Sequence, residues 1–545
     1  MKAIKVASIQ YEPIKKQVDK NLKNITDLII EASENGAELI VLPEMCTTGY
    51  IWQDRQEIKP FVETIPGKTT DLISNLTRKY NNYVVIGMGE KNDKDIYYNS
   101  AALVGPEGYI GRYRKVHSFI ADPMWAKDGD EGIKVFKTKI GNIGICICMD
   151  LNIPETTKIM YRKGCDVICA PCNWTGEKVP STFWHQRALE TDTPIIISNR
   201  WGEEKGVVFT GGSCIIDQKG DLVNYKEKDN VCVYADLQIE EEKLEMPKYS
   251  FYKELIRNPY TWNPVWFYKQ YDNKLPKGKK FKISTLQIKR RRLSSREEIS
   301  KILIDSIKKE QSKNSKLILF PKNILNPYIN GKIEILEKEI LETMIGEIIK
   351  NIAEDTYVVV SYLNKQKKST ALILKGEGIV YEYEQIFSKE TKNSYEEGDL
   401  NYFDTEYGRF GILFGEELIN FEFARILTLK GIDLLLIPDE SGKEYNKLNS
   451  EKNILWTMAK SRSRENNIYT VYSNYSNENE NIGYSGIFGP NSFFKENDYI
   501  YSKFSEGMLS MEVNTEEKSK KFPQNTIKYK PFMHSRKIDF YEDLI

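Results

Sequence analysis

Three side chains that can carry out acyl transfer come directly after three predicted strands: Glu44, Lys115 and Cys148. A thiol is mostly protonated at neutral pH, so a nucleophilic cysteine needs a base that takes its proton. A carboxylate can be that base, and an ammonium group can stabilise the negative charge of a tetrahedral intermediate. The three residue types together are the set that acyl transfer through a thioester would use.

Spacing alone is equally compatible with a structural role for each of these residues. Cysteine is among the most buried residue types and is usually inert, so Cys148 could be a packing residue. Glu44 could cap a helix, and Lys115 could be an ordinary surface charge. The elements around the three positions therefore have to be considered before any role is assigned.

Predicted strands and helices alternate along this part of the chain. Residues 18–32 have apolar side chains at helical spacing, and the Asn-Gly pair at 35–36 ends that helix. A Gly-Pro-Glu-Gly turn at 105–108 predicts a hairpin between its flanking strands. Helical crossovers combined with hairpins predict mixed sheets covered by helices. Two such sheets packed face to face give an α-β-β-α sandwich.

The chain repeats this pattern after residue 280. The segments IKVASIQ, VLPEM and IGICICMD return as FKISTLQ, LFPKN and FGILFGEE, in the same order. At the positions of Glu44, Lys115 and Cys148, however, the second copy has Lys322, Gln385 and Gly415. The acid, the cation and the thiol are all missing, so we expect the second copy to be a non-catalytic homologue of the first.

A repeat of this length predicts two domains, because 545 residues are too many for one hydrophobic core. We expect a catalytic domain with its C-terminal tail at 1–272, a linker at 273–280 and a non-catalytic domain at 281–545.

Composition excludes several classes of partner. The 78 basic and 78 acidic residues cancel, which gives no electrostatic reason to expect nucleic acid or a membrane surface. No apolar stretch approaches the ~20 residues that span a bilayer. The first residues already form a strand and lack a signal-peptide core, so we expect a cytoplasmic protein. All eight cysteines lie in the first copy, which argues against a disulfide framework.

Three of these cysteines, Cys165, Cys169 and Cys172, have the spacing of an iron–sulfur motif. They lie along a predicted strand and the turn after it, where successive side chains point to opposite faces. We therefore expect buried small hydrophobic residues here and no metal site.

The catalytic candidates lie in motifs that match a known family. VLPEMCTTGY, GRYRKVH and IGICICMDLNIPE resemble the three signature segments of the nitrilase superfamily, the carbon–nitrogen hydrolases. APCNW, RALETDTPIIISNRWG and FTGGSCIID fit the same family. The resemblance implies the α-β-β-α sandwich, with Glu44 as general base and Cys148 as nucleophile. It further implies Lys115 as stabiliser of the intermediate and proton donor, an oxyanion contact from the N–H of Met149, and no metal or organic cofactor.

Further site residues follow from the same resemblance. Many members carry a second glutamate between the lysine and the cysteine, and the nearest acid here is Asp122. Its side chain is one methylene shorter, so Asp122 either replaces that glutamate or holds the turn before Pro123. Trp125, Asn173 and Trp174 are candidate substrate-binding residues, and the alternative for them is a structural role as core aromatic or turn amide.

Family members that hydrolyse nitriles typically read Cys-Trp-Glu, whereas this chain reads Cys-Met-Asp at 148–150. That difference favours hydrolysis of a small amide or N-carbamoyl compound by water, with ammonia or an amine as the product. The alternatives are a nitrilase acting on a nitrile and a non-hydrolytic binding or scaffold protein.

Subunits of this family commonly dimerise with a tail that reaches the partner, so we expect the two copies to form an intramolecular pseudo-dimer. Further homo-oligomers stay open.

Overall fold

The computed structural model describes residues 2–176, 179–239, 248–261, 263–270, 273–387, 398–441, 454–477, 483–490, 499–517 and 526–545. The chain forms two compact units. Unit 1 consists of Met1–Met246 together with Ser535–Ile545, and unit 2 consists of Pro247–His534. The repeat alone assigned the last residues to the second domain, but they pack on unit 1, and the expected linker at 273–280 lies within unit 2.

Two six-stranded sheets form the centre of unit 1 in the described part of the chain, in the orders β14-β1-β2-β3-β4-β5 and β13-β12-β9-β8-β7-β6. In each sheet three adjacent strands run parallel, and the remaining strands pair antiparallel with their neighbours. The strands of the first sheet are β1 (Lys2–Gln10), β2 (Leu39–Val41), β3 (Tyr83–Lys91), β4 (Tyr97–Gly105), β5 (Gly108–Arg114) and β14 (Val231–Ile239). The strands of the second are β6 (Val135–Thr138), β7 (Gly141–Ile145), β8 (Val167–Cys172), β9 (Ile195–Asn199), β12 (Ser213–Ile216) and β13 (Leu222–Lys226).

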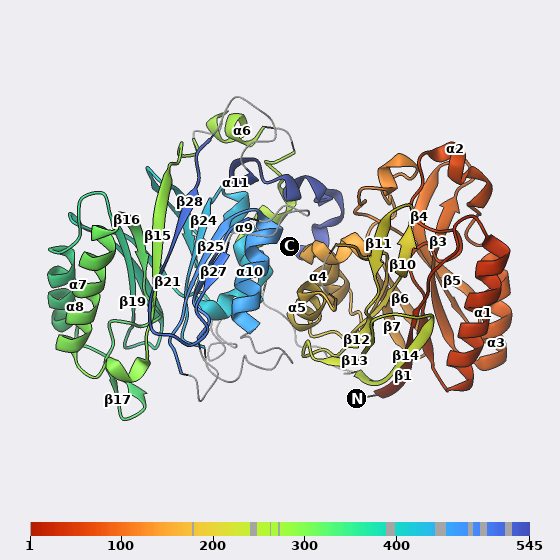
Figure 1. The fold of residues 1–545 in the computed structure, drawn as a ribbon, viewed down its shortest axis with the longest axis horizontal. Helices are drawn as coiled ribbons and strands as arrows, with labels where there is room; N and C mark the ends of the chain where they lie inside the picture. Colours follow the sequence, from red (N-terminus) through yellow and green to blue (C-terminus); the bar gives the residue numbers. More distant parts are fainter. Residues whose placement is uncertain are drawn as a thin grey trace. The chain divides into compact units, whose positions relative to one another are not determined.

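The two sheets of unit 1 pack face to face, and helices cover their outer faces (Figure 1). The Ser8 hydroxyl donates to the Ile197 carbonyl at 2.6 Å, which joins β1 to β9 across the sandwich. Helices α1 (Val18–Glu34) and α3 (Lys68–Tyr80) lie on the first sheet, and α4 (Pro154–Arg162) and α5 (Thr182–Thr191) lie on the second. The predicted α-β-β-α sandwich is confirmed.

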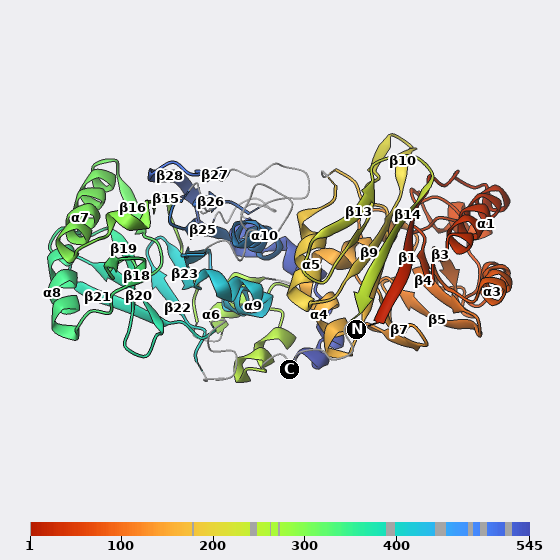
Figure 2. The same ribbon diagram turned by 90° about the horizontal axis from the view of Figure 1, so that it is seen from below.

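The two six-stranded sheets of unit 2 have the same strand order as those of unit 1, and helices again lie on their outer faces (Figure 2). Its sheets have the orders β21-β20-β19-β16-β15-β28 and β22-β23-β24-β25-β26-β27. The Ser473 hydroxyl donates to the Leu286 carbonyl at 3.0 Å and again joins the two sheets. The strands are β15 (Lys280–Gln287), β16 (Ser315–Leu319), β19 (Tyr357–Leu363), β20 (Ser369–Lys375), β21 (Gly378–Glu384), β22 (Tyr402–Thr405), β23 (Gly408–Ile412), β24 (Leu434–Pro438), β25 (Tyr469–Ser473), β26 (Gly486–Phe488), β27 (Tyr499–Tyr501) and β28 (Gly507–Asn514). The helices on their outer faces are α7 (Arg296–Ser312), α8 (Lys338–Ile349), α9 (Phe421–Leu429) and α10 (Ile454–Asn466).

Short elements complete the chain. Hairpin β10–β11 lies between β9 and β12, helix α2 lies between β2 and β3, and η4 and α6 lie at the start of unit 2. The bounds are Trp201–Glu204 for β10, Val207–Thr210 for β11, Arg55–Ile58 for α2, Ser250–Ile256 for η4 and Pro264–Gln270 for α6. None of the helices in the described ranges is long and apolar enough to cross a bilayer.

Candidate active site

The strand ends of the first sheet bring a lysine and two acids together. Glu44 lies just beyond β2, Lys115 directly follows β5, and Asp122 begins the 3-10 helix η2 (Asp122–Met124). The Lys115 Nζ lies 2.7 Å from Glu44 Oε1 and 2.7 Å from Asp122 Oδ2. All three side chains are at most 1% exposed, so solvent does not screen these contacts. The structure thus brings together the predicted base, the predicted stabiliser and the nearest acid.

Asn99 on β4 joins the two acids, and it was not among the residues predicted from the sequence. Its Nδ2 donates to Glu44 Oε1 at 2.7 Å and to Asp122 Oδ1 at 2.9 Å. The backbone carbonyl of Asn99 accepts a hydrogen bond from the Lys115 backbone N–H at 2.8 Å. An asparagine inside a buried strand needs polar partners, and that signal could have identified it.

Cys148 begins the 3-10 helix η3 (Cys148–Asn152), three residues after β7 ends. Its φ is 47°, a left-handed conformation that is strained for a residue with a side chain and that is concentrated at functional sites. Its thiol hydrogen-bonds with the thiol of Cys172, the last residue of β8. Cys172 is buried as predicted, but its contact with the candidate nucleophile was not foreseen.

Burial sets the protonation states of this cluster. The hydrogen bond with Cys172 and burial raise the pKa of the Cys148 thiol well above its usual value, although the Lys115 charge opposes this. Burial also raises the pKa of the Glu44 carboxyl, because the Lys115 charge offsets only part of the effect. For Lys115, burial is outweighed by the neighbouring carboxylates, which hold the pKa of the ammonium group well above its usual range. A protonated thiol therefore faces a charged lysine and a carboxyl with raised proton affinity.

One oxygen of Glu44 is left for chemistry. Glu44 Oε1 accepts hydrogen bonds from Lys115 Nζ and Asn99 Nδ2. Glu44 Oε2 is buried and has no hydrogen-bond partner among the described residues. Met149 follows Cys148 as the second residue of η3, so its N–H lies at the helix end where amides lack acceptors within the helix. A free carboxylate oxygen and an amide at a helix start are the groups that proton removal and oxyanion binding require.

Asp150 braces the turn that carries Cys148. Its Oδ2 accepts from the Ile147 N–H at 2.8 Å and from the Tyr113 hydroxyl at 2.8 Å. Its Oδ1 accepts from the His117 N–H at 3.0 Å and lies 2.7 Å from His117 Nδ1. Asp150 therefore ties η3 to the end of β5 and to the segment after Lys115.

The equivalent acid of unit 2 makes the same brace without a nucleophile. Glu417 accepts from the Phe414 N–H at 2.8 Å and from the Tyr383 hydroxyl at 2.9 Å. Burial raises the pKa of Glu417 to about 7. Because the contact persists where the thiol is absent, the acid two residues after the nucleophile position serves the fold.

Two of the three candidate substrate-binding residues have polar groups that the described residues leave unpaired. Asn173 follows Cys172, and neither its Oδ1 nor its Nδ2 has a partner in the described part of the chain. Trp125 packs in one cluster with Tyr50, and its indole N–H and the Tyr50 hydroxyl are likewise unpaired there. An unpaired buried polar group costs roughly 1–3 kcal/mol, which marks these atoms as places where water or a substrate binds.

Trp174 contacts the fold itself. Its backbone N–H donates to Asn199 Oδ1 at 2.8 Å, and its ring meets the Trp184 ring edge-on at 5.3 Å between centroids. The structure thus gives Trp174 packing contacts, whereas Asn173 and Trp125 have polar atoms left for a ligand.

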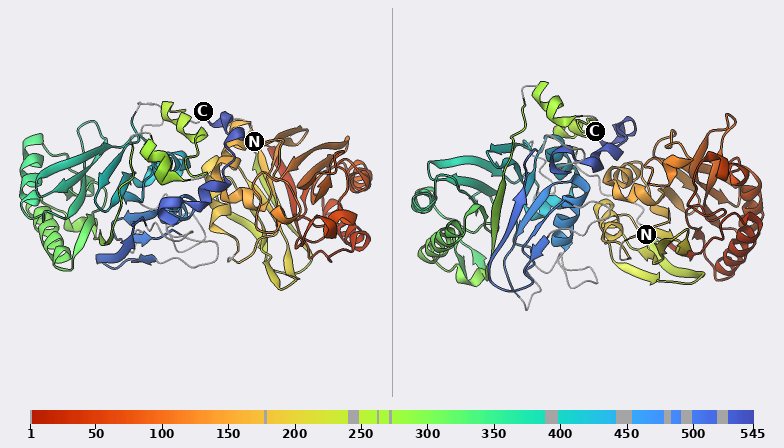
Figure 3. Two further views of the ribbon diagram at one scale, coloured as in Figure 1. Left: turned by 90° about the horizontal axis from the view of Figure 1, so that it is seen from above. Right: turned by 45° about the horizontal axis from the view of Figure 1, so that its top comes forward.

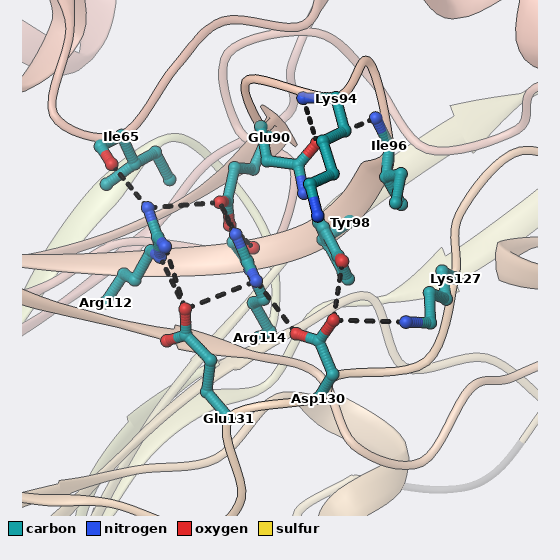
Figure 4. A network of polar contacts seen from close by, with 12 residues as sticks. Ile65, Glu90, Lys94, Ile96, Tyr98, Arg112, Arg114, Lys127, Asp130 and Glu131 are labelled. Carbon is teal, nitrogen blue, oxygen red and sulfur yellow. Dashed lines mark hydrogen bonds and ion pairs between the residues drawn. The ribbon is translucent and has the colours of Figure 1, made fainter.

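An ionic network holds the loop between Lys115 and β6 (Figure 4). Arg114 pairs with Asp130 at 2.8 Å and with the buried Glu90, and Arg112 pairs with Glu131 at 2.8 Å. The Tyr98 hydroxyl donates to Asp130 at 2.7 Å. Asp122 and Trp125 lie in the same loop, so the network anchors the part of it that leads to β6.

In unit 2 a carboxyl lies beside the nucleophile position. A Cβ placed on Gly415 would lie 2.1 Å from Asp439 Oδ1. Asp439 accepts from the hydroxyls of Ser441 and Tyr472, and burial raises its pKa to about 6. Gln385 donates to the Phe387 carbonyl at 2.7 Å. No thiol lies beside Gly415 in the described part of the chain, and the Asp439 carboxyl is hydrogen-bonded to the two hydroxyls.

Comparison with known proteins matches both units. The model of the carbon–nitrogen hydrolase family matches residues 5–243 and again residues 285–493. A nitrilase of Pyrococcus abyssi is 39% identical over 222 residues, which cover 41% of this chain and 84% of that protein. A probable nitrilase of Schizosaccharomyces pombe is 30% identical over 267 residues, which cover 47% of this chain and 96% of that protein.

Amidases are also among the similar proteins. An omega-amidase of Xenopus tropicalis is 26% identical over 257 residues, which cover 44% of this chain and 90% of that protein. Among solved structures, an amidase from Nesterenkonia sp. is 20% identical and matches with a TM-score of 0.39, over 43% of this chain and 90% of that one.

Proposed function

This chain belongs to the carbon–nitrogen hydrolase family, and from that premise we propose that Cys148 of unit 1 hydrolyses a small amide or N-carbamoyl compound through a thioester. The chain is an amidase-type enzyme of the nitrilase superfamily. The observation that supports the proposal is the buried cluster in which Lys115 lies between Glu44 and Asp122, with the Cys148 thiol within range of their charges.

In the first half of the reaction, Glu44 Oε2 takes the proton of the Cys148 thiol, and the sulfur attacks the carbonyl carbon. The Lys115 ammonium group and the Met149 N–H stabilise the oxyanion that forms. When the intermediate collapses, Lys115 gives a proton to the leaving nitrogen, and ammonia or an amine departs. Lys115 regains a proton from Glu44, whose Oε1 lies 2.7 Å away.

In the second half, the ionised Glu44 takes a proton from water, and the hydroxide attacks the thioester carbonyl. The second intermediate expels the Cys148 thiolate, which regains the proton that Glu44 holds. The products are a carboxylic acid, or a carbamic acid from a carbamoyl substrate, and the free thiol. Each step uses residues of unit 1 and water.

Several of the polar groups that the described residues leave unpaired around Glu44 and Lys115 are neutral, among them the Asn173 amide, the Trp125 indole N–H and the Tyr50 hydroxyl. They favour a small uncharged acyl group that both donates and accepts hydrogen bonds. Met149 in place of tryptophan after the nucleophile favours an amide or carbamoyl group over a nitrile. The similar protein named as an omega-amidase supports the same choice.

We further propose that unit 2 is non-catalytic, since its strand ends carry Lys322, Gln385 and Gly415 with a carboxyl in the nucleophile's space. The packing of the two units as a pseudo-dimer stays a prediction.

Ammonia release across panels of primary amides, N-carbamoyl compounds and nitriles tests the function. Hydroxylamine would intercept the thioester as a hydroxamate. We expect turnover of an amide or carbamoyl compound that Cys148→Ala abolishes and that Cys214→Ala, a change of another buried cysteine, leaves intact. Turnover of nitriles alone would identify a nitrilase. No turnover together with no labelling of Cys148 by amide-derived electrophiles would favour a binding protein.

A further inference from the structure

The last eleven residues of the chain follow unit 2 in sequence but pack on unit 1 (Figure 3). Ser535–Ile545 contains two short 3-10 helices, η11 (Ile538–Phe540) and η12 (Glu542–Leu544). Helix η12 packs against α4, which starts directly after the Cys148 turn η3. The segment therefore touches the part of unit 1 that carries the nucleophile.

A buried ion pair fixes the start of this segment. Arg536 Nε donates to Glu155 Oε1 at 2.8 Å, and neither side chain is exposed. Glu155 is the second residue of α4, three positions after η3 ends. Loss of one partner of a buried pair leaves an uncompensated charge, so Arg536 and Glu155 hold each other in place.

A chain of hydrogen-bonding groups runs from Tyr541 to the Cys148 turn. The Tyr541 hydroxyl lies 3.4 Å from His117 Nε2, and His117 Nδ1 lies 2.7 Å from Asp150 Oδ1. Asp150 braces η3 through the Ile147 N–H. His117 comes two residues after Lys115, so these contacts connect Tyr541 with the segments that carry Lys115 and Cys148.

The segment also holds the loop that carries Asp122. Lys537 Nζ lies 2.5 Å from Asp128 Oδ2, and Asp128 accepts from the Ser118 hydroxyl. The Phe540 ring lies 3.3 Å from the place of a Cβ on Gly132, whose φ is +72°. The two contacts lie in the part of the loop that leads to β6, and Asp128 connects them with Ser118 near its start.

The segment that follows the first copy in the sequence belongs to unit 2 and packs on its helix α9. The hydroxyls of Tyr260 and Tyr268 donate to the carbonyls of Thr428 and Leu429, at the end of α9. Helix α9 of unit 2 corresponds to α4 of unit 1 in the repeat. The segment that packs on α4 is thus Ser535–Ile545, which follows unit 2 in the sequence.

We propose that Ser535–Ile545 is a positioning element of the catalytic unit, in which Arg536 and Tyr541 hold η3 and the segment after Lys115 in their productive arrangement. This inference rests on the proposed function of Cys148. It gives the non-catalytic copy a role, because the chain reaches unit 1 a second time only after passing through unit 2.

The first test is a truncated protein that lacks residues 535–545 and ends at His534. Misplacement of catalytic groups by about 1 Å can cost on the order of 100-fold in rate, so we expect kcat to fall by at least tenfold with KM little changed. The rate at which iodoacetamide alkylates Cys148, followed by peptide mass spectrometry, should also differ between the truncated and the full-length protein. A synthetic peptide of residues 535–545 added in excess should restore part of the lost kcat. An unchanged kcat after truncation would overturn the proposal.

Point variants keep the test decisive if the truncated chain does not fold. Tyr541→Phe removes one hydroxyl, and we expect a loss of kcat of severalfold or more at unchanged KM and unchanged thermal unfolding. Asp543→Asn is the matched control, since Asp543 is half-exposed and pairs with Lys163 at the surface. Equal kcat for both variants would contradict the proposal. An inactive wild-type protein with an unreactive Cys148 would instead refute the proposed function.

Discussion

Asp122 Oδ2 lies 2.7 Å from Lys115 Nζ, although the aspartate side chain is one methylene shorter than the glutamate that many family members carry. Asp122 is the first residue of η2. The same Oδ2 accepts from the Phe119 N–H at 2.8 Å. One carboxylate thus contacts both Lys115 and the backbone of the turn, and its role as an acid of the site stays a prediction.

The charge of Asp122 is predicted to set the pH dependence of Glu44. Because that charge contributes to the raised pKa of Glu44, Asp122→Asn should lower this pKa and shift the acid limb of kcat/KM to lower pH. The wild-type limb should lie above pH 4.5, the ordinary value for glutamate. A pH–rate profile of both proteins measures the shift. A limb that moves to higher pH would contradict the assignment of Glu44 as base.

Asn99→Ala should move the same limb in the opposite direction. The Asn99 amide donates to Glu44 and stabilises its ionised form, so removal of the donor should raise the pKa of Glu44 further. Activity would then disappear at a higher pH on the acid side. Asp122→Asn and Asn99→Ala are controls for each other, because both disturb the cluster but only one shift can be upward. Shifts in the same direction would show that general disruption causes them.

Much of this site follows from the sequence because strand ends converge in a sheet. Glu44, Lys115 and Cys148 stood out by their places after predicted strands and by their replacement together in the second copy, and the resemblance of their motifs to the nitrilase superfamily assigned their roles. Asn99 and Cys172 could not be identified in this way, because their roles depend on which strands are neighbours and which face each side chain points to. The packing of the C-terminal segment on unit 1 could not be predicted either, because the repeat pattern carries no information on which copy a tail contacts.

Cys172→Ala is predicted to make the nucleophile more reactive at neutral pH in the free enzyme. The hydrogen bond with Cys172 is the largest cause of the raised pKa of Cys148, so its removal should lower that pKa and increase the thiolate fraction. The rate of alkylation of Cys148 by iodoacetamide, followed against pH, should rise at a lower pH than in the wild type. Cys214→Ala should leave the curve in place, since Cys214 is buried elsewhere, in β12. An unshifted curve for Cys172→Ala would refute the thiol–thiol contact.

Asn173→Ala is predicted to weaken substrate binding. The Asn173 amide has no partner among the described residues and lies next to Cys172, so a bound substrate would be its partner. Loss of one such hydrogen bond costs about 0.5–1.5 kcal/mol, or roughly 2- to 13-fold. We expect this loss in kcat/KM, mainly through KM. A loss confined to kcat would instead place Asn173 in transition-state stabilisation, and an unchanged kcat/KM would remove it from the pocket.

Unit 2 offers a test of whether its nucleophile position is closed. A Cβ on Gly415 would meet Asp439 Oδ1 at 2.1 Å, so Gly415→Ala must displace a buried carboxyl that accepts from Ser441 and Tyr472. We expect unit 2 to lose about 1–3 kcal/mol of unfolding free energy, as other overpacked cores do. Gly346→Ala is the control, because a Cβ there meets nothing within 4 Å and alanine favours helix α8 by up to ~1 kcal/mol. Calorimetry should therefore show opposite shifts for the two variants, while ammonia release by unit 1 is unchanged in both. A neutral Gly415→Ala would mean that Asp439 leaves this space at little cost, and the position would then be open to a ligand.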